Sequence, residues 1–401
     1  MQRTVIAVIS AIFVSLLFGC GGQSTNNAQT DTFDAYLSAA ADVWQFQGTV
    51  LVAQGDSVLF TRGYGPARLD RDVMNTPDLK YCLGSVTKAF TAVAIMQLWD
   101  QGLIDLDAPF ATYLPDYRSD IAQSVTIHHL LSHTSGIADL VNDTAFIRRA
   151  MTANRSLQPE ELLTYSEPKE LLFQPGDRFA YSSANFVLLG LIIDSVCGEP
   201  PDVYIQRHIC RPASMINTGV FPGRVARDDF ALGYHPGPDR RMIPAPVLHP
   251  SFGYAAGDLS ATVDDLHRFH LALENGTLLS DSARSLMERQ HTRRHGYAWY
   301  VNDFGGHRLI ADSGAVPGFA ATWQRWPDDS LCLVILSNNA AVKTHHVANA
   351  LAAIALEEPY YRPLVRNPGN VRPADLIPYT GVYQAEQETR RIDTHGDQLK
   401  M

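Results

Sequence analysis

The feature that most constrains this chain is residues 81–88 (YCLGSVTK), where Gly84 precedes Ser85 and Lys88 follows three residues later. Apolar residues then recur at spacings of three and four, which predicts a buried helix over 86–101. Positions i and i+3 of a helix lie about 5–6 Å apart, so Ser85 and Lys88 are neighbours. The N-terminus of a helix also favours a developing negative charge. The sequence therefore predicts that Ser85 is an activated nucleophile.

The same Ser-x-x-Lys spacing occurs again at Ser166 and Lys169. There Pro168 opposes a regular helix, no glycine precedes the serine, and no long apolar helix follows. We interpret this second copy as a pair of surface residues. The spacing alone does not identify a catalytic site, so the other motifs of the chain have to.

Composition and charge exclude several classes of protein. The chain has 401 residues, a hydrophobic content of 46% and a charged content of 18%, which are typical of a globular protein with an ample core. The net charge of −10 comes from interspersed residues without a basic block, which argues against nucleic acid as a partner. No Gly-x-Gly-x-x-Gly follows a predicted strand, and we expect no cofactor.

The N-terminus has the pattern of an export signal. Arg3 precedes an apolar run over 5–18 that is too short for a secure membrane span, so residues 1–19 are predicted to be a signal peptide. Residues 17–20 (LFGC) resemble the lipobox of bacterial lipoproteins, which implies that Cys20 is lipidated and becomes the mature N-terminus. Ordinary secretion or a retained anchor are the alternatives.

Residues 20–31 are polar and are predicted to be a flexible tether between the anchor and the domain. Gly21, where an aspartate could stand, resembles lipoproteins that are sent on to the outer membrane. We therefore expect an exported, periplasmic protein held to a bacterial membrane by its lipid, with the outer membrane favoured.

Four further cysteines, Cys82, Cys197, Cys210 and Cys332, have no Cys-x-x-Cys spacing, which argues against a zinc ribbon or a redox dithiol. Cys197 and Cys210 flank one predicted helix and can either pair as a disulfide or remain buried thiols. The sequence leaves both open.

The order of predicted elements indicates an α/β fold of the α+β type. A hairpin is predicted over 46–63, a long helical middle follows, and four strand-like runs lie over 297–336. We expect an antiparallel sheet built from the N-terminal hairpin and the C-terminal strands, flanked by helices. The expected domain covers 32–360, with a mostly helical subdomain over about 105–250 and loops over the site at 220–252. Residues 361–401 are predicted to be a linker and an incomplete appendage.

Three motifs in order make the chain resemble the penicillin-recognising serine hydrolases, in particular the class C β-lactamase-like branch of β-lactamases, DD-peptidases, D-aminopeptidases and esterases. They are the Ser85 motif, Tyr181-Ser182-Ser183 and Asp312-Ser313-Gly314. The resemblance spans about residues 32–355, with further matches at residues 126–136 (TIHHLLSHTSG), Pro175-Gly176, residues 188–190 (LLG) and residues 316–319 (VPGF). It implies a β-lactamase/transpeptidase-like fold.

The resemblance also implies roles for individual residues. Ser85 would be the nucleophile, Lys88 and Tyr181 would handle protons, and the backbone N–H groups of Ser85 and Ala315 would hold the oxyanion. Ser183, Asp312, Ser313 and Gly314 would bind substrate. A lysine in water is a poor base at neutral pH, so burial or a second cation is expected to activate Lys88.

Two departures from the family pattern limit the choice of substrate. Ser183 stands where the family often has asparagine, and Asp312 stands where it has lysine or histidine. That cation receives the substrate carboxylate in β-lactamases, and an aspartate would repel it by about 1–4 kcal/mol at 4 Å. The alternative is that Asp312 pairs with a local cation and meets no substrate.

Two further patterns in the sequence compete with this site. Tyr300-Val301-Asn302 matches Tyr-x-Asn in letters, but it lies in a predicted strand too close to Ser313, so Tyr181 is preferred. His129 and His133 have a metal-ligand spacing, but Leu130 stands where His-Glu-x-x-His has its glutamate. We interpret both histidines as structural and expect no metal.

The sequence thus predicts an exported serine hydrolase that forms an acyl-enzyme on an ester, amide or peptide substrate and is not an efficient β-lactamase. The alternatives are a catalytically silent binding protein on the same scaffold and a true β-lactamase or DD-peptidase. Oligomeric state and the identity of the substrate are not determined by the sequence.

Overall fold

The computed structural model describes two parts of the chain. The first covers residues 22–364 except 118, 153–154, 159–160, 163, 165–169, 224–226, 240 and 293, and the second covers 377, 380–385, 388–395 and 398–400. The predicted signal peptide, Cys20 and the second Ser-x-x-Lys copy lie outside these residues. One compact unit ends at Arg362 and another begins at Pro363, and each is described by itself.

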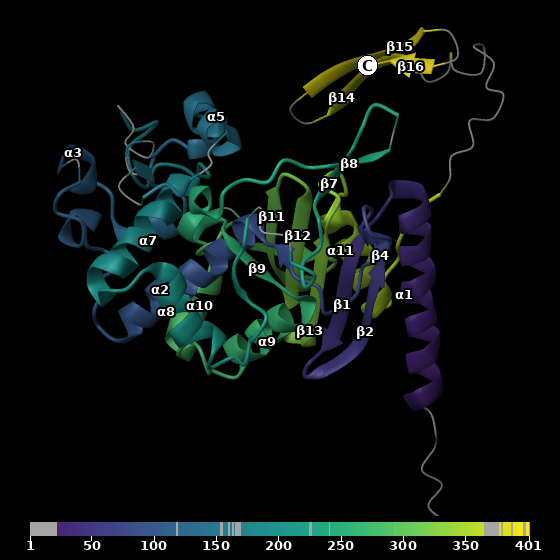
Figure 1. The fold of residues 1–401 in the computed structure, drawn as a ribbon, viewed down its shortest axis with the longest axis horizontal. Coiled ribbons are helices and arrows are strands. Elements are labelled where there is room, and N and C mark those ends of the chain that lie inside the picture. Colours follow the sequence, from purple (N-terminus) through teal and green to yellow (C-terminus); the bar gives the residue numbers. More distant parts are fainter. Residues whose placement is uncertain are drawn as a thin grey trace, which may run out of the picture. The chain divides into compact units, whose positions relative to one another are not determined.

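A six-stranded antiparallel sheet is the centre of the first unit, in the order β10-β11-β12-β13-β1-β2 (Figure 1). The N-terminal hairpin joins the C-terminal strands where β1 pairs with β13, from Gly48 opposite Ser337 to Gln54 opposite Leu331. This confirms the predicted sheet made from both ends of the chain. The strands are β1 (Gly48–Gln54), β2 (Ser57–Tyr64), β10 (Tyr300–Phe304), β11 (His307–Val316), β12 (Phe319–Trp326) and β13 (Leu331–Ser337).

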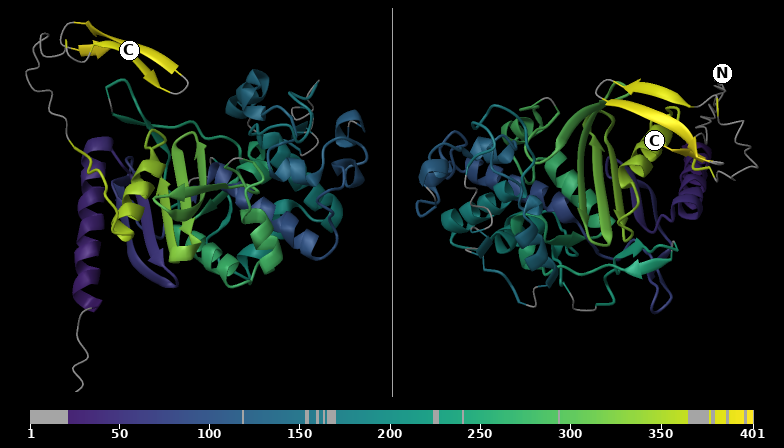
Figure 2. Two further views of the ribbon diagram at one scale, coloured as in Figure 1. Left: turned by 180° about the vertical axis from the view of Figure 1, so that it is seen from behind. Right: turned by 90° about the horizontal axis from the view of Figure 1, so that it is seen from above.

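Helices cover both faces of the sheet, as the two views of Figure 2 show. Val50 and Val52 pack on one face with α1 (Gly22–Trp44) and α11 (Thr344–Ala355), whereas Leu51 and Ala53 join the core of the opposite face. That second core includes α2 (Thr87–Asp100), α9 (Val263–Glu274) and α10 (Asp281–Glu288). Because both faces are buried, the central strands are almost continuously apolar.

The sequence predicts a flexible tether over residues 20–31, but the structure has a helix there, because α1 begins at Gly22. The physical reason is the buried face of the helix, on which Phe33, Tyr36 and Leu37 pack against the sheet and α11. Gln29 adds a hydrogen bond from its side-chain amide to the carbonyl of Ile354 at 3.3 Å. Packing of this kind extends a helix through residues whose own propensity is weak.

Helices dominate the described chain between α2 and α9, which agrees with the predicted helical middle. The side chain of Thr126 accepts a hydrogen bond from the backbone N–H of His129, which caps the helix that begins at Ile127. The helices are α3 (Ser119–Ala122), α4 (Ile127–Leu131), α5 (Thr144–Thr152), α7 (Ser183–Cys197) and α8 (Pro201–Ile205), followed by one turn of π-helix, η4 (Gln206–Cys210).

Short elements complete the first unit. Two hairpins are formed by β3 (Pro66–Arg68) with β4 (Val73–Met74) and by β7 (Tyr234–Pro236) with β8 (Met242–Pro244), and a small sheet by β5 (Tyr81–Cys82), β9 (Leu259–Ala261) and β6 (Gly219–Val220). Single 3₁₀ turns are η1 (Gly84–Val86), η2 (Phe110–Thr112), η3 (Leu140–Asn142), η5 (Pro250–Phe252), η6 (Tyr254–Ala256) and η7 (Pro327–Asp329).

The second unit contains a three-stranded antiparallel sheet in the stretch predicted to be an incomplete appendage. Its strands are β14 (Gly381–Ala385), β15 (Glu388–His395) and β16 (Gln398–Lys400).

Across the described parts of both units, no helix has the length and apolar character needed to cross a bilayer. Four cysteines are free thiols: Cys82, Cys197, Cys210 and Cys332. Cys197 and Cys210 therefore do not form a disulfide with each other in the structure.

Strand β11 passes unusually close to the turn that carries Ser85. Gly84 has a left-handed φ of +54°, and a Cβ there would lie 2.9 Å from the backbone nitrogen of Ala315. A Cβ on Gly314 would overlap the carbonyl oxygen of Leu83 and lie 2.8 Å from the backbone nitrogen of Ser85. Only glycine fits at these two positions, so they set the distance between the strand and the nucleophile.

We therefore predict that Gly314→Ala lowers the free energy of unfolding by about 1–3 kcal/mol, because the strand has to move away from Leu83. Activity should fall by more than tenfold, since displacements near 1 Å disturb reacting geometry severely. Gly305→Ala, in the open turn at the other end of β11, is the control: its left-handed φ of +63° strains a residue with a Cβ and costs stability, but no atom lies within 4 Å, so the strand need not move and activity should be retained. Thermal unfolding and turnover of a chromogenic ester measure both effects; wild-type activity in Gly314→Ala would contradict the proposed constraint.

Candidate active site

The three predicted catalytic side chains meet at one point. Ser85 lies in η1, directly before α2, and is half-buried. Its Oγ accepts a hydrogen bond from Lys88 Nζ at 3.0 Å and another from the Tyr181 hydroxyl at 2.8 Å. Tyr181 comes from the turn before α7, 96 residues further along the chain. The serine oxygen therefore has two proton-handling groups within hydrogen-bond reach.

Lys88 is held by neutral oxygen atoms. Its side chain is only 2% exposed, and Nζ donates a second hydrogen bond to the carbonyl of Ala256 at 2.7 Å. Thr91, one turn further along α2, donates to the neighbouring carbonyl of Ala255 at 2.7 Å, which fixes η6 against the helix. Within the described parts of the chain, no carboxylate forms an ion pair with Lys88. The amine is thus positioned by hydrogen bonds to two neutral oxygen atoms, from Ser85 and Ala256.

A buried histidine supports Tyr181. The imidazole of His133 lies 4.5 Å from the Tyr181 ring, centroid to centroid, and its Nδ1 accepts a hydrogen bond from the backbone N–H of Ser182 at 3.1 Å. Burial lowers the pKa of His133 well below its ordinary value, and His295 and Lys88 lower it further. The ring is therefore neutral at physiological pH and acts as an uncharged wall behind the tyrosine.

The metal alternative finds no site in the described residues. His129 Nδ1 accepts a hydrogen bond from the N–H of Thr126, and the Nδ1 of His133 is engaged by Ser182. No three His, Cys, Asp or Glu side chains of the described chain are grouped so that they could hold a metal ion. One ring nitrogen of each histidine therefore accepts a hydrogen bond from the backbone, which is what a structural role predicts.

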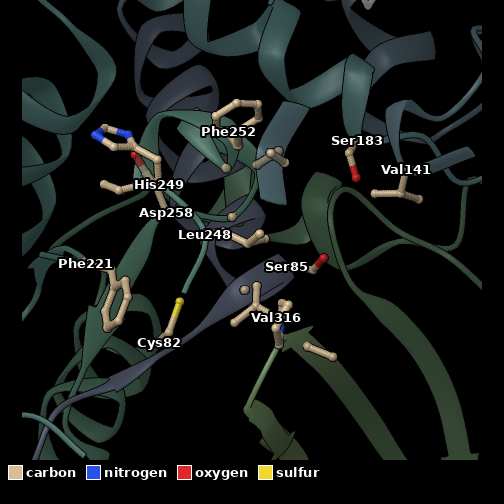
Figure 3. A pocket seen from close by; sticks show the side chains of 18 of the residues that line it. Cys82, Ser85, Val141, Ser183, Phe221, Leu248, His249, Phe252, Asp258 and Val316 are labelled. Atoms are coloured by element: carbon tan, nitrogen blue, oxygen red, sulfur yellow. The ribbon is translucent and has the colours of Figure 1, made fainter. Parts of the chain in front are cut away.

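A cavity of about 300 Å³ opens beside Ser85 and is shown in Figure 3. Ser85, Lys88, Ser183 and the backbone of Ala315 border it, so four of the residues predicted from sequence share one space. The segment 245–252 contributes a wall, which agrees with the prediction of loops over the site. Most of the remaining lining is aliphatic or aromatic.

Asp258 is an acidic residue in this cavity wall. Burial raises the pKa of its carboxyl well above the ordinary value, and the neighbouring Asp202 raises it further. Among the lining residues that the structure describes, the only lysine or arginine is Lys88, which is already bound to Ser85 and Ala256. The cavity therefore offers little to a substrate carboxylate.

The structure does not place Asp312 in the cavity. Its side chain is 5% exposed, its Oδ1 accepts a hydrogen bond from the N–H of Ser313 at 2.7 Å, and its buried Oδ2 has no partner in the described part of the chain. Burial raises the pKa of Asp312 to about 8. The predicted repulsion between a charged Asp312 and a substrate carboxylate is therefore wrong, because Asp312 is buried, mostly protonated and outside the cavity.

The remaining predicted residues are placed as follows. Ser313 is exposed on β11 but does not border the cavity, and Gly314 is buried against Leu83. Tyr300, the rejected alternative to Tyr181, is 38% exposed and packs edge-on against His295. The pKa of Tyr300 is raised by burial and by the nearby Tyr181 and Asp312, and in the described part of the chain no hydrogen bond joins it to Ser85.

The match of residues 33–357 to the sequence profile of the Beta-lactamase family decides the family. This chain belongs to the β-lactamase family. It is thus a member of a family of serine hydrolases, as the resemblance in its motifs predicted. The fold of the first unit, an antiparallel sheet flanked by helices, is the β-lactamase/penicillin-binding-protein fold.

Similar proteins share most of this chain. PbpX of Bacillus subtilis strain 168 is 30% identical over 278 residues, which are 68% of this chain and 66% of PbpX, so the match spans just under two thirds of that relative. The octameric penicillin-binding protein homologue from Pyrococcus abyssi has a TM-score of 0.76 at 25% identity, covering 92% of this chain and 86% of that one. A D-stereospecific amidohydrolase from Streptomyces sp. has a TM-score of 0.67 at 25% identity, covering 81% and 98%.

Two contributors to this β-lactamase-family site were not predicted from sequence. The carbonyl of Ala256 binds Lys88 through its backbone, which leaves no signal in the residue type. Asp139 accepts a hydrogen bond from the N–H of Ser183 at 2.9 Å and so fixes the start of α7. An acidic residue near a helix start is a detectable signal, but its distance of 44 residues from Ser183 hides the pairing.

The buried carboxyl of Asp312 predicts a specific dependence of stability on pH. Its folded-state pKa is about 8, whereas an unfolded aspartate ionises near pH 4. Between these values the folded protein keeps a proton that the unfolded chain loses, so this residue makes stability fall as pH rises from about 4 to 8. We expect Asp312→Asn to gain stability over wild type by on the order of 1 kcal/mol per pH unit in that window.

Chemical denaturation at pH 4 to 8 measures this difference, with the exposed Asp116→Asn as the control that should follow wild type. Parallel pH profiles for Asp312→Asn and wild type would show that the carboxyl ionises normally in the folded protein.

Proposed function

We propose that this protein hydrolyses an ester or amide through an acyl-enzyme on Ser85. The observation that carries the proposal is the pair of hydrogen bonds to Ser85 Oγ, from Lys88 at 3.0 Å and from Tyr181 at 2.8 Å. A serine hydroxyl needs a nearby base to become a nucleophile, and both distances fall within the range for proton transfer. A silent binding protein on this scaffold would have no need for the complete set.

The proposed reaction has two steps. Ser85 Oγ attacks the substrate carbonyl carbon while its proton passes to the deprotonated form of Lys88 or Tyr181. The negative charge on the carbonyl oxygen is stabilised by the backbone N–H groups of Ser85 and Ala315, which the close approach of β11 supports. Tyr181 then gives a proton to the leaving alcohol or amine as the carbonyl carbon–leaving group bond breaks. Water attacks the resulting ester in the second step and releases the acid and free Ser85.

Substrates without a carboxylate near the scissile bond fit the cavity best. Lys88 is the only lysine or arginine among the described lining residues, which supports this, because a buried unpaired carboxylate costs several kcal/mol. The likeness to the D-stereospecific amidohydrolase from Streptomyces sp. supports amide chemistry as well. Acylation by penicillins is the second candidate, favoured by the name of the Pyrococcus abyssi homologue.

Covalent labelling by a fluorophosphonate probe, followed by peptide mapping, tests whether Ser85 is the nucleophile. We expect the label on Ser85, complete loss of label in Ser85→Ala, and a fall in ester turnover of about 10²–10⁴-fold in Lys88→Ala and in Tyr181→Phe. Ser166→Ala, in the second Ser-x-x-Lys copy, is the matched control and should label like wild type. Label that persists in Ser85→Ala would contradict the assignment of Ser85 as the nucleophile.

A labelled penicillin incubated in parallel separates the two candidate substrate classes. Turnover of esters or amides without stable penicillin labelling supports the favoured class, whereas rapid penicillin acylation at Ser85 supports the second candidate.

We also propose that the protein is exported to the periplasm and anchored to a membrane by a lipid on Cys20. The lipobox-like LFGC sequence at residues 17–20 supports this. We expect mass spectrometry of the mature protein to find a lipid-modified cysteine at its N-terminus, and Cys20→Ala to move the protein from the membrane to the soluble fraction. An unmodified N-terminus in wild-type protein would contradict the anchor.

A further inference from the structure

The cavity beside Ser85 is bounded by two apolar walls from separate parts of the chain. One wall comes from α5, where Phe146, Ile147 and Met151 line the space, and the other comes from Leu248 and Phe252. Figure 3 shows Leu248 and Phe252 on one side of Ser85 and Val141, in η3 just before α5, on the other. A volume of about 300 Å³ is within the usual range for small-molecule sites.

The apolar surface continues outward at the α5 wall. Ile147 and Met151 are 40% and 41% exposed although they line the cavity. These side chains are one turn apart on α5, so they form one stripe that leads from the surface toward Ser85. An exposed apolar stripe that continues into a catalytic cavity fits an apolar ligand whose end projects beyond the enclosed space.

The position of Tyr181 distinguishes the two halves of a substrate. Its hydroxyl contacts Ser85 Oγ, but Tyr181 is not among the residues that line the cavity. In the proposed reaction Tyr181 protonates the leaving group, which therefore departs on the Tyr181 side of Ser85. Tyr181 does not line the cavity, whereas Ala315, whose N–H is proposed to hold the carbonyl oxygen, and the adjacent Val316 do. The group that fills the cavity is thus the acyl half, which remains on the serine after the leaving group departs.

We infer that this cavity binds the apolar acyl chain of an uncharged ester or amide, and that it makes the enzyme selective for medium-length over short acyl groups. This inference rests on the proposed function and adds the class of acyl group. The raised pKa of Asp258 agrees with it, because a protonated acid leaves the chamber without a fixed negative charge. Each methylene that enters the chamber should raise kcat/KM about fourfold.

The test measures kcat/KM for p-nitrophenyl acetate, butyrate, hexanoate and octanoate, which differ only in the acyl chain. We expect a rise from acetate at about fourfold per methylene until the chamber is filled, and a flat series would overturn the inference. Ethyl, butyl and hexyl acetates vary the alcohol instead. A rise along that second series in place of the first would also overturn it, because the chamber would then hold the leaving group.

A matched pair of variants assigns the effect to the cavity. Leu248→Asp places a charge in the wall and should lower the hexanoate-to-acetate ratio at least tenfold. Ile243→Asp, in β8 just before the wall segment, is outside the lining and 41% exposed, and should keep the wild-type ratio. The ratio is taken within one preparation, so a loss of folded protein cancels from it. An unchanged ratio in Leu248→Asp would overturn the assignment of the chain to this cavity.

A comparison with p-nitrophenyl esters of amino acids of similar size tests the role of Asp258. A preference for the amine-bearing esters over plain acyl esters would overturn the inference and assign Asp258 as an amine receptor. Failure of the proposed function is distinguishable, since it removes all turnover and the fluorophosphonate label on Ser85 together, whereas failure of the inference leaves both in place and only changes the order of substrates.

Discussion

The contact between β11 and the Ser85 turn is the constraint on which the site depends. Gly84 and Gly314 allow two backbone segments, separated by more than 200 residues in sequence, to approach closer than any side chain would permit. The nucleophile is carried by the first turn before α2, whereas the strand belongs to the central sheet. A single backbone contact therefore couples the helical core to the sheet, and the geometry for holding an oxyanion depends on both.

Around this contact several titratable groups are held together in the site with few ion pairs among them. Lys88 is bound by a hydroxyl and a carbonyl, the imidazole of His133 is kept neutral by burial, and Asp312 is mostly protonated at neutral pH. Each arrangement avoids the large cost of an unpaired buried ion. The consequence is a site in which proton transfer at Ser85 has few competing ion pairs, and which suits a neutral substrate better than a charged one.

The sequence allowed the local parts of this site to be predicted and left its tertiary parts open. The Ser85–Lys88 pair follows from helical spacing, and the apolar strand-like runs at both ends of the chain were enough to predict one sheet. The placement of Asp312 was not predictable in this way. Whether a strand residue points inward depends on register, and the pleat that exposes Ser313 buries Asp312. The carbonyl of Ala256 and the wall formed by α5 likewise depend on packing between distant segments, which no local pattern records.

The groups that contact Ser85 and the walls of the cavity come from different parts of the fold. The sheet, α2 and the start of α7 hold Ser85, Lys88 and Tyr181 through close contacts that tolerate little change. The cavity walls come from α5 and from a segment with short strands and turns, whose lining side chains are only partly buried at several positions. Under the proposed function, substitutions in these walls therefore alter the acyl group that fits while the reacting atoms remain in place. This explains how one catalytic arrangement can serve different substrates, since function on a shared fold is determined by the site that its loops build.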